Sequence, residues 1–187
     1  AIRHLRARSA SYNVDPERIG IWGSSSGGYL VGMLGLAGPT AGFEGRGAFA
    51  NTPSGVRAVV AEFPQVSFEL PIFSKVEQES RDAAVPSSAT AEFRRAVSLF
   101  TYVTREAPPF LILHGDADPV LSPATARDLY DRLIGAGATA TFVLVKNGGH
   151  GWAPTAARTA GTSGAISPPQ EEITQLRVAF FEKHLKP

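Results

Sequence analysis

The sequence predicts an α/β fold with a mostly parallel sheet flanked by helices, and three observations lead to this prediction. Apolar, β-branched runs at 19–22, 56–63, 109–116 and 140–147 are typical of strands buried on both faces. Helical patterns alternate with these runs, which favours parallel pairing. With 187 residues, 43% of them hydrophobic, the chain is long enough for one domain, 1–187, with a substantial core.

The remaining segments are assigned by the same patterns. Helices are predicted over 2–12, after Gly27, and over 123–136 and 170–185. Residues 38–55 are rich in proline and glycine and predict a loop. Residues 64–108 lack strand signals, show a helical stretch near 91–100, and predict an insertion that serves as a lid. The low-complexity segment 153–169 predicts a mobile loop.

Composition excludes several classes of function. Eighteen basic and seventeen acidic side chains give a net charge of +1, so no global field favours nucleic acid or an anionic membrane as partner. The absence of cysteine excludes disulfides, thiolate metal sites and a cysteine nucleophile, and leaves the compartment open. No run has the length of a membrane span, and no signal peptide is apparent. Because the chain begins with Ala1, we expect it to be processed, trimmed or excerpted.

The stretch Gly23-Ser24-Ser25-Ser26-Gly27 joins the first strand to a helix and fits the pattern G-x-S-x-G. So tight a turn places Ser25 in strained backbone, and glycine at 23 and 27 is expected to prevent collisions with the strand and the helix. The Ser25 hydroxyl then lies at a helix N-terminus, which favours developing negative charge. The pattern predicts a serine nucleophile, with a Gly/Ser-rich turn capping an ordinary helix as the alternative.

A serine nucleophile needs a histidine base, and the histidine needs a carboxylate to orient it. "HGDADPVLSP" after the third strand offers Asp116 and Asp118, and "NGGHGWAP" after the fourth offers His150. These residues follow the C-terminal ends of parallel strands, where open α/β sheets place their sites. Glu62, near the end of the second strand, is a third candidate for the acid. We rank Asp118 ahead of Glu62 and Asp116.

Other histidines and aromatic residues have weaker signals. His114 lies within the third apolar run and is predicted to be structural, bonded to nearby backbone. Four aromatic side chains are candidates for lining an apolar substrate pocket, although aromatic residues beside strands are more often core: Phe63, Phe68, Phe73 and Trp152.

Four stretches of the chain resemble an α/β-hydrolase of the acetyl-esterase or feruloyl-esterase type: "AIRHLRARSASYNVDPERIGIWGSSSGGYL", "SLFTYVTREAPPFLILHGDADPVLSP", "GGHGW" and "VAFFEKHLK". The resemblance covers nearly the whole chain except 153–169. It implies a catalytic triad of Ser25, Asp118 and His150, and it favours Asp118 over Asp116. It also implies a serine carboxylic-ester hydrolase that takes short acyl or aryl esters as small-molecule substrates and needs no metal or cofactor.

In this family the G-x-S-x-G turn is the nucleophile elbow, and an H-G-G-G stretch that precedes the elbow supplies backbone N–H groups that complete the oxyanion hole. This chain has no such stretch. It therefore resembles only the C-terminal part of the fold, its four strands corresponding to the fifth to eighth. The Ser26 N–H is expected to be one oxyanion donor, and the second has no identifiable source. Strand 19–22 would lack a neighbour, which predicts pairing along that edge with a second copy or with an upstream segment.

Two other interpretations remain open at this stage. A peptidase of the prolyl-oligopeptidase type shares the elbow, although the surroundings of Ser25 and Asp118 resemble the esterases more. A weakly active or inactive fragment that assembles with another chain is the second, and the missing H-G-G-G stretch favours it.

Overall fold

The computed structural model describes residues 1–38, 41–71, 73–86, 88–152 and 164–186. Its strands are β1 (Gly20–Ser24), β2 (Ala58–Glu62), β3 (Phe110–Gly115) and β4 (Ala140–Val145). Its helices are α1 (Ile2–Ala7), α2 (Ser9–Tyr12), α3 (Ser26–Leu36), α4 (Lys75–Ala84), α5 (Ala91–Ala96), α6 (Pro123–Gly135) and α7 (Gln170–Leu185), with short 3-10 turns η2 (Leu99–Tyr102) and η3 (His150–Trp152).

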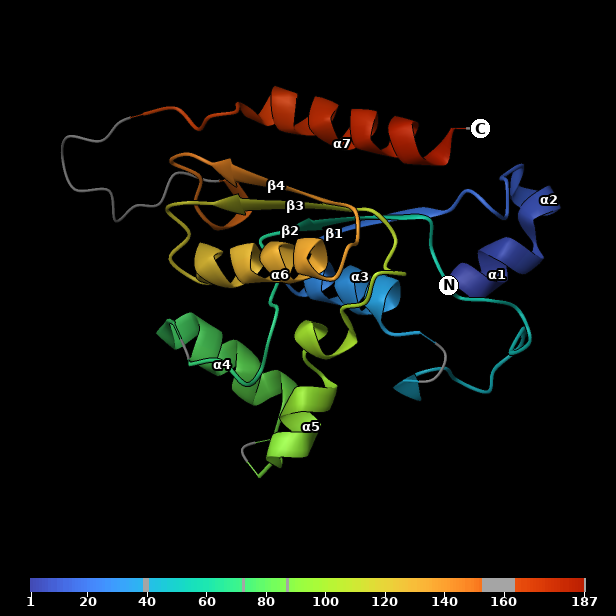
Figure 1. The fold of residues 1–187 in the computed structure, drawn as a ribbon, viewed down its shortest axis with the longest axis horizontal. Helices are drawn as coiled ribbons and strands as arrows, with labels where there is room; N and C mark the ends of the chain where they lie inside the picture. The colour runs from blue at the N-terminus through green and yellow to red at the C-terminus, as the bar shows by residue number, and fades with distance from the viewer. Residues whose placement is uncertain (39–40, 72, 87, 153–163, 187) are drawn as a thin grey trace.

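The four strands form one parallel sheet in the order β1-β2-β3-β4. Figure 1 shows α7 on one face of this sheet and α3 and α6 on the other, with α4 and α5 farther out on the α3 side. Because all four strands run in the same direction, their C-terminal ends meet at one edge. The α/β architecture with a parallel sheet is thus confirmed.

The sheet has a hydrophobic core on each face, because neighbouring residues of a strand point to opposite sides. Toward α3 and α6, Val59, Phe110 and Ile112 pack with helix residues such as Leu129. Toward α7, the side chains of Val60, Leu111 and Leu113 join Ile173 and Phe180, among others. Every residue of β2 and β3 is buried, as expected for the central strands of a parallel sheet.

The helices differ from the prediction in two places. The helix predicted over 2–12 is divided, because Arg8 adopts φ −115° and ψ 21° between α1 and α2. Helix α4 was not predicted, although Ser74 and Glu77 form an S-x-x-E start signal for it. The Ser74 hydroxyl accepts the Glu77 N–H at 3.0 Å, so this signal is used in the fold.

The insertion 64–108 contributes α4, α5 and η2, and its role as a lid stays a prediction. Of the segment predicted to be a mobile loop, residues 153–163 lie outside the described residues. Farther along, Ser167 pairs with Lys146 through two backbone hydrogen bonds of 2.8 and 3.0 Å.

Within the described residues, β1 has a strand neighbour only on its β2 side. Large apolar side chains are exposed on β1 and on α3, since Trp22 is 54% and Leu30 is 60% exposed. Unpaired strand edges flanked by apolar surface favour association. Pairing along the edge 19–22, with a second copy or an upstream segment, stays a prediction.

Light scattering over a range of concentrations tests this prediction. If two copies pair along β1, the measured mass is twice that of the chain, because the free edge is satisfied by an identical edge. A monomer that is soluble, compact and fully active would contradict both forms of the prediction.

Candidate active site

Ser25 lies in the turn between β1 and α3, with φ 55° and ψ −122°. This left-handed backbone is strained for a residue other than glycine, as the pattern around Ser25 predicts. The Ser25 N–H donates to the Glu62 carbonyl oxygen at 2.9 Å, which ties the turn to the end of β2. Ser25 therefore lies at the C-terminal edge of the sheet, directly after β1 and hydrogen-bonded to the end of β2.

The glycines around Ser25 meet the predicted steric need only in part. A Cβ at Gly23 would lie 2.4 Å from the Gly27 carbonyl oxygen, so glycine is required at 23. The expectation for Gly27 is wrong, since a Cβ there meets nothing within 4 Å. Gly28 is the second tight position, because its Cβ would lie 2.9 Å from the Glu62 carbonyl oxygen. The helix turns residue 27 outward and residue 28 toward the sheet.

The structure brings Ser25, His150 and Asp118 together from the ends of β1, β4 and β3. His150 Nε2 lies 2.9 Å from Ser25 Oγ, and His150 Nδ1 lies 2.9 Å from Asp118 Oδ2. A carboxylate only accepts, so Nδ1 carries the hydrogen and Nε2 is left to accept from the serine hydroxyl. This tautomer is the one that allows the imidazole to act as a base toward Ser25.

Asp118 is 4% exposed, and four groups donate to its carboxylate. Oδ1 accepts the N–H groups of Val120 at 2.8 Å and Leu121 at 3.1 Å. Burial opposes ionisation, but hydrogen bonds from His114, His150 and these two amides outweigh it and hold the pKa of Asp118 far below its ordinary value. The carboxylate is consequently ionised at neutral pH.

His114 has a larger part in the site than the sequence indicated. Its side chain is fully buried, and its Nε2 lies 3.1 Å from both the Leu121 carbonyl oxygen and Asp118 Oδ2. Both oxygens are acceptors, so Nε2 carries the hydrogen. The predicted bond to backbone is present, and the contact with Asp118 is the one that sequence reasoning missed.

The two other candidates for the acid lie elsewhere. Asp116 Oδ1 accepts the Asn147 N–H at 2.6 Å and so joins the ends of β3 and β4. The Glu62 carboxylate is 3.5 Å from Arg177, and the indoles of Trp22 and Trp152 also face it. Burial raises the pKa of Glu62, and these neighbours offset only part of the increase.

Phe63 packs against the imidazole of His150, and Trp152 packs against Phe63. Their ring centroids are 4.9 Å apart, and the Phe63 centroid is 4.7 Å from that of His150, edge to face. Both are nearly buried, at 4% and 7% exposure. Phe68 is buried against Tyr29, whereas Phe73 is 53% exposed. Substrate contact by Phe63 and Trp152 stays a prediction.

The Ser26 N–H lies in the first turn of α3, where amides have no partner within the helix. Its role as an oxyanion donor stays a prediction. Among the described residues, no group of three or more histidines and carboxylates is arranged to hold a metal ion. In the same part of the chain, no helix combines the length and apolar character needed to cross a membrane.

The depressed pKa of Asp118 predicts a pH-dependent stability. The folded state binds the proton less tightly than the unfolded state, so Asp118 stabilises the fold fully above about pH 5 and progressively less as the pH falls below about 4. In urea unfolding at pH 7, the free energy of unfolding of Asp118→Asn is expected to be at least about 1 kcal/mol lower than that of wild type. At pH 3.5 this difference in free energy is expected to be smaller. Asp131→Asn, which removes an exposed ion pair, is the control. An equal difference in unfolding free energy between wild type and Asp118→Asn at both pH values would contradict the depressed pKa of Asp118.

Comparisons with known proteins identify the family to which the chain belongs. A model of the BD-FAE family matches residues 1–133. Esterase LipQ of Mycobacterium tuberculosis is 29% identical in an alignment of 158 positions that covers 80% of this chain and 36% of LipQ. Esterase LipC of the same organism is 28% identical in a gapped alignment of 194 positions that covers 98% of this chain and 47% of LipC. The chain thus spans between about a third and a half of these relatives.

A solved structure, the truncated form of a carbohydrate esterase from gut microbiota, is 32% identical with a TM-score of 0.72, covering 81% of this chain and 59% of that one. A thermophilic esterase from Thermogutta terrifontis is 22% identical with a TM-score of 0.74, covering 100% and 64%, and shows likeness of fold alone. Because the family model spans well over half of the chain, this protein belongs to the BD-FAE family and has an α/β-hydrolase fold of the esterase type.

Proposed function

We propose that the chain is a serine carboxylic-ester hydrolase that acts on short acyl or aryl esters. The observation that supports this most directly is the continuous hydrogen-bonded series Ser25–His150–Asp118, with 2.9 Å at each step. Spacings of this length are those of a nucleophile within reach of its base and a base within reach of its orienting acid.

In the acylation step, Ser25 Oγ attacks the ester carbonyl carbon while His150 Nε2 takes the hydroxyl proton. The imidazolium that forms is stabilised by ionised Asp118 at Nδ1. The Ser26 N–H donates to the oxyanion of the tetrahedral intermediate. Collapse of this intermediate breaks the bond to the alcohol oxygen, which leaves with the proton from Nε2.

In the deacylation step, His150 takes a proton from water as the water oxygen attacks the acyl carbon. The second intermediate collapses by breaking the bond to Ser25 Oγ, and the imidazolium returns the proton to that oxygen. The carboxylic acid is released and the free serine is restored. Asp118 remains ionised throughout, and its depressed pKa suits that role.

The relatives favour an ester over a peptide bond as the substrate. LipQ, LipM and LipC are all named as esterases or ester hydrolases, and the structure at 32% identity is named a carbohydrate esterase. These names support ester hydrolysis over the prolyl-oligopeptidase type of peptidase. Turnover of a peptide anilide in place of an ester would favour the peptidase.

One observation favours a second candidate, a weakly active chain that works with another segment. The chain spans only 32–47% of the length of its curated relatives, and of the two oxyanion donors expected in this family only the Ser26 N–H is predicted from its residues. Losing one such donor costs about 100- to 1,000-fold in turnover. A turnover that is low but dependent on Ser25 would support this candidate.

Turnover of p-nitrophenyl acetate by wild type and Ser25→Ala tests the proposal. We expect the substitution to lower kcat at least about 1,000-fold, because no other group replaces the nucleophile. Ser24→Ala is the matched control, since it removes an exposed hydroxyl one residue away and preserves the turn. Equal turnover by wild type and Ser25→Ala would contradict the proposal.

A further inference from the structure

One hydroxyl of the insertion reaches the peptide unit that holds Asp118. The Ser74 Oγ donates to the Val120 carbonyl oxygen at 2.7 Å. The N–H of that same peptide unit belongs to Leu121 and donates to Asp118 Oδ1 at 3.1 Å. A single planar peptide therefore lies between Ser74 and the acid, accepting on one side and donating on the other.

Ser74 is held in place as the N-cap of α4. Its oxygen accepts the Glu77 N–H at 3.0 Å, and its single hydrogen is directed to Val120. The orientation of the hydroxyl is thus set by the start of the helix. The same hydroxyl therefore joins the start of α4 to residues 116–122, the loop between β3 and α6 that we call the acid loop.

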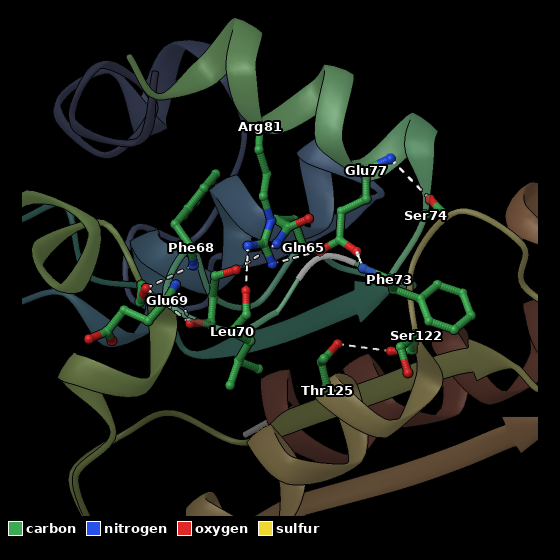
Figure 2. Close-up of polar contacts among 12 residues, drawn as sticks. Gln65, Phe68, Glu69, Leu70, Phe73, Ser74, Glu77, Arg81, Ser122 and Thr125 are labelled. Atoms are coloured by element: carbon green, nitrogen blue, oxygen red, sulfur yellow. Dashed lines mark hydrogen bonds and ion pairs between the residues drawn. The ribbon is translucent and has the colours of Figure 1, made fainter. Parts of the chain in front are cut away.

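A buried ion pair fixes this helix start, as Figure 2 shows. Glu77 Oε1 and Arg81 Nη2 are 2.6 Å apart, and the two residues are only 3% and 5% exposed. The second carboxylate oxygen accepts the Phe73 N–H at 2.7 Å, and Arg81 Nη1 donates to the Leu70 carbonyl oxygen at 2.7 Å. The pair therefore binds the backbone on the N-terminal side of Ser74.

Stability alone explains this ion pair poorly. Burying two charges costs free energy that their attraction only partly returns, and apolar residues of similar size are often as stable. What a buried pair with directed hydrogen bonds does supply is a fixed geometry. Here the fixed element is Ser74, the residue that contacts the acid loop.

We propose that Ser74 is a positioning residue for the acid, through which the insertion 64–108 orients Asp118 by way of the peptide unit between Val120 and Leu121. This inference rests on the proposed ester hydrolysis, in which Asp118 orients His150. A hydrogen bond accepted at a peptide oxygen polarises the unit and strengthens the bond that its N–H donates. Glu77 and Arg81 act one step farther away, by holding Ser74.

Three substitutions of Ser74 separate this role from helix capping. Ser74→Ala removes both the cap and the donor, Ser74→Asp keeps a good cap but has no hydrogen to donate, and Ser74→Thr keeps both. We expect kcat to fall about 3- to 10-fold in the first two, as for one lost hydrogen bond, with KM little changed and kcat retained in Ser74→Thr. A wild-type kcat in Ser74→Asp would mean that Ser74 only caps α4, and it would contradict the proposal.

Two matched controls lose a cap without touching the acid. Thr90 caps α5 in the same insertion by accepting the Phe93 N–H, and Ser122 caps α6 beside the acid loop by accepting the Ala124 N–H. Thr90→Ala and Ser122→Ala should leave kcat within twofold of wild type. A fall as large as that of Ser74→Ala in either control would contradict the proposal.

Proton NMR of the downfield His150 Nδ1–H resonance provides a readout that needs no turnover, so the inference can be judged even if ester hydrolysis is not found. We expect this resonance to shift in Ser74→Ala and Ser74→Asp, and to keep its wild-type position in Ser74→Thr and Ser122→Ala. Glu77→Gln weakens the ion pair with Arg81 and leaves Ser74 intact, so this variant should shift the resonance less. Glu77→Gln is also the variant to use if Ser74→Ala does not fold. An unchanged resonance in folded Ser74→Asp and Glu77→Gln would overturn the inference.

Discussion

The arrangement of the site depends on one buried carboxylate that must remain charged. Asp118 is almost entirely removed from water, and an ionised group there is tolerated only where donors replace its hydration. His114, His150 and the amides of Val120 and Leu121 supply those donors. Because two of the four are histidines on different segments, stabilising the charge also fixes the ring that faces Ser25.

The parallel sheet provides the second constraint. Ser25, Asp118 and His150 are far apart in the chain, yet each follows the C-terminal end of a strand, and parallel pairing brings these ends to one edge. The end of β3 also lies very close to the loop that follows β4 and carries His150. A Cβ on Gly115 would lie 2.1 Å from the Gly148 carbonyl oxygen. Backbone packing, as well as hydrogen bonding, therefore sets the position of the base.

The sequence was informative wherever a local pattern carried the chemistry. The apolar runs predicted the strands, and the residues after them predicted which side chains meet at the sheet edge. Contacts that depend on the path of the backbone in space were not predictable. His114 lies only four residues before Asp118, yet nothing in the local sequence indicates that the two side chains meet, and the Gly28 approach to the end of β2 and the contact of Ser74 with the Val120 carbonyl oxygen have no local signature either. The Gly27 expectation failed because the motif alone does not give the direction in which the first turn of α3 presents its residues.

Reaction with a fluorophosphonate, followed by intact mass and peptide mapping, tests directly whether this geometry activates a serine. An activated nucleophile forms a covalent phosphonate by displacing fluoride, whereas an ordinary surface serine does not react. One adduct per chain on Ser25, formed much more slowly in His150→Asn, is the expected result. No adduct, or an adduct on Ser24 or Ser26 that forms equally fast without His150, would contradict the assignment of Ser25, His150 and Asp118 as one catalytic unit.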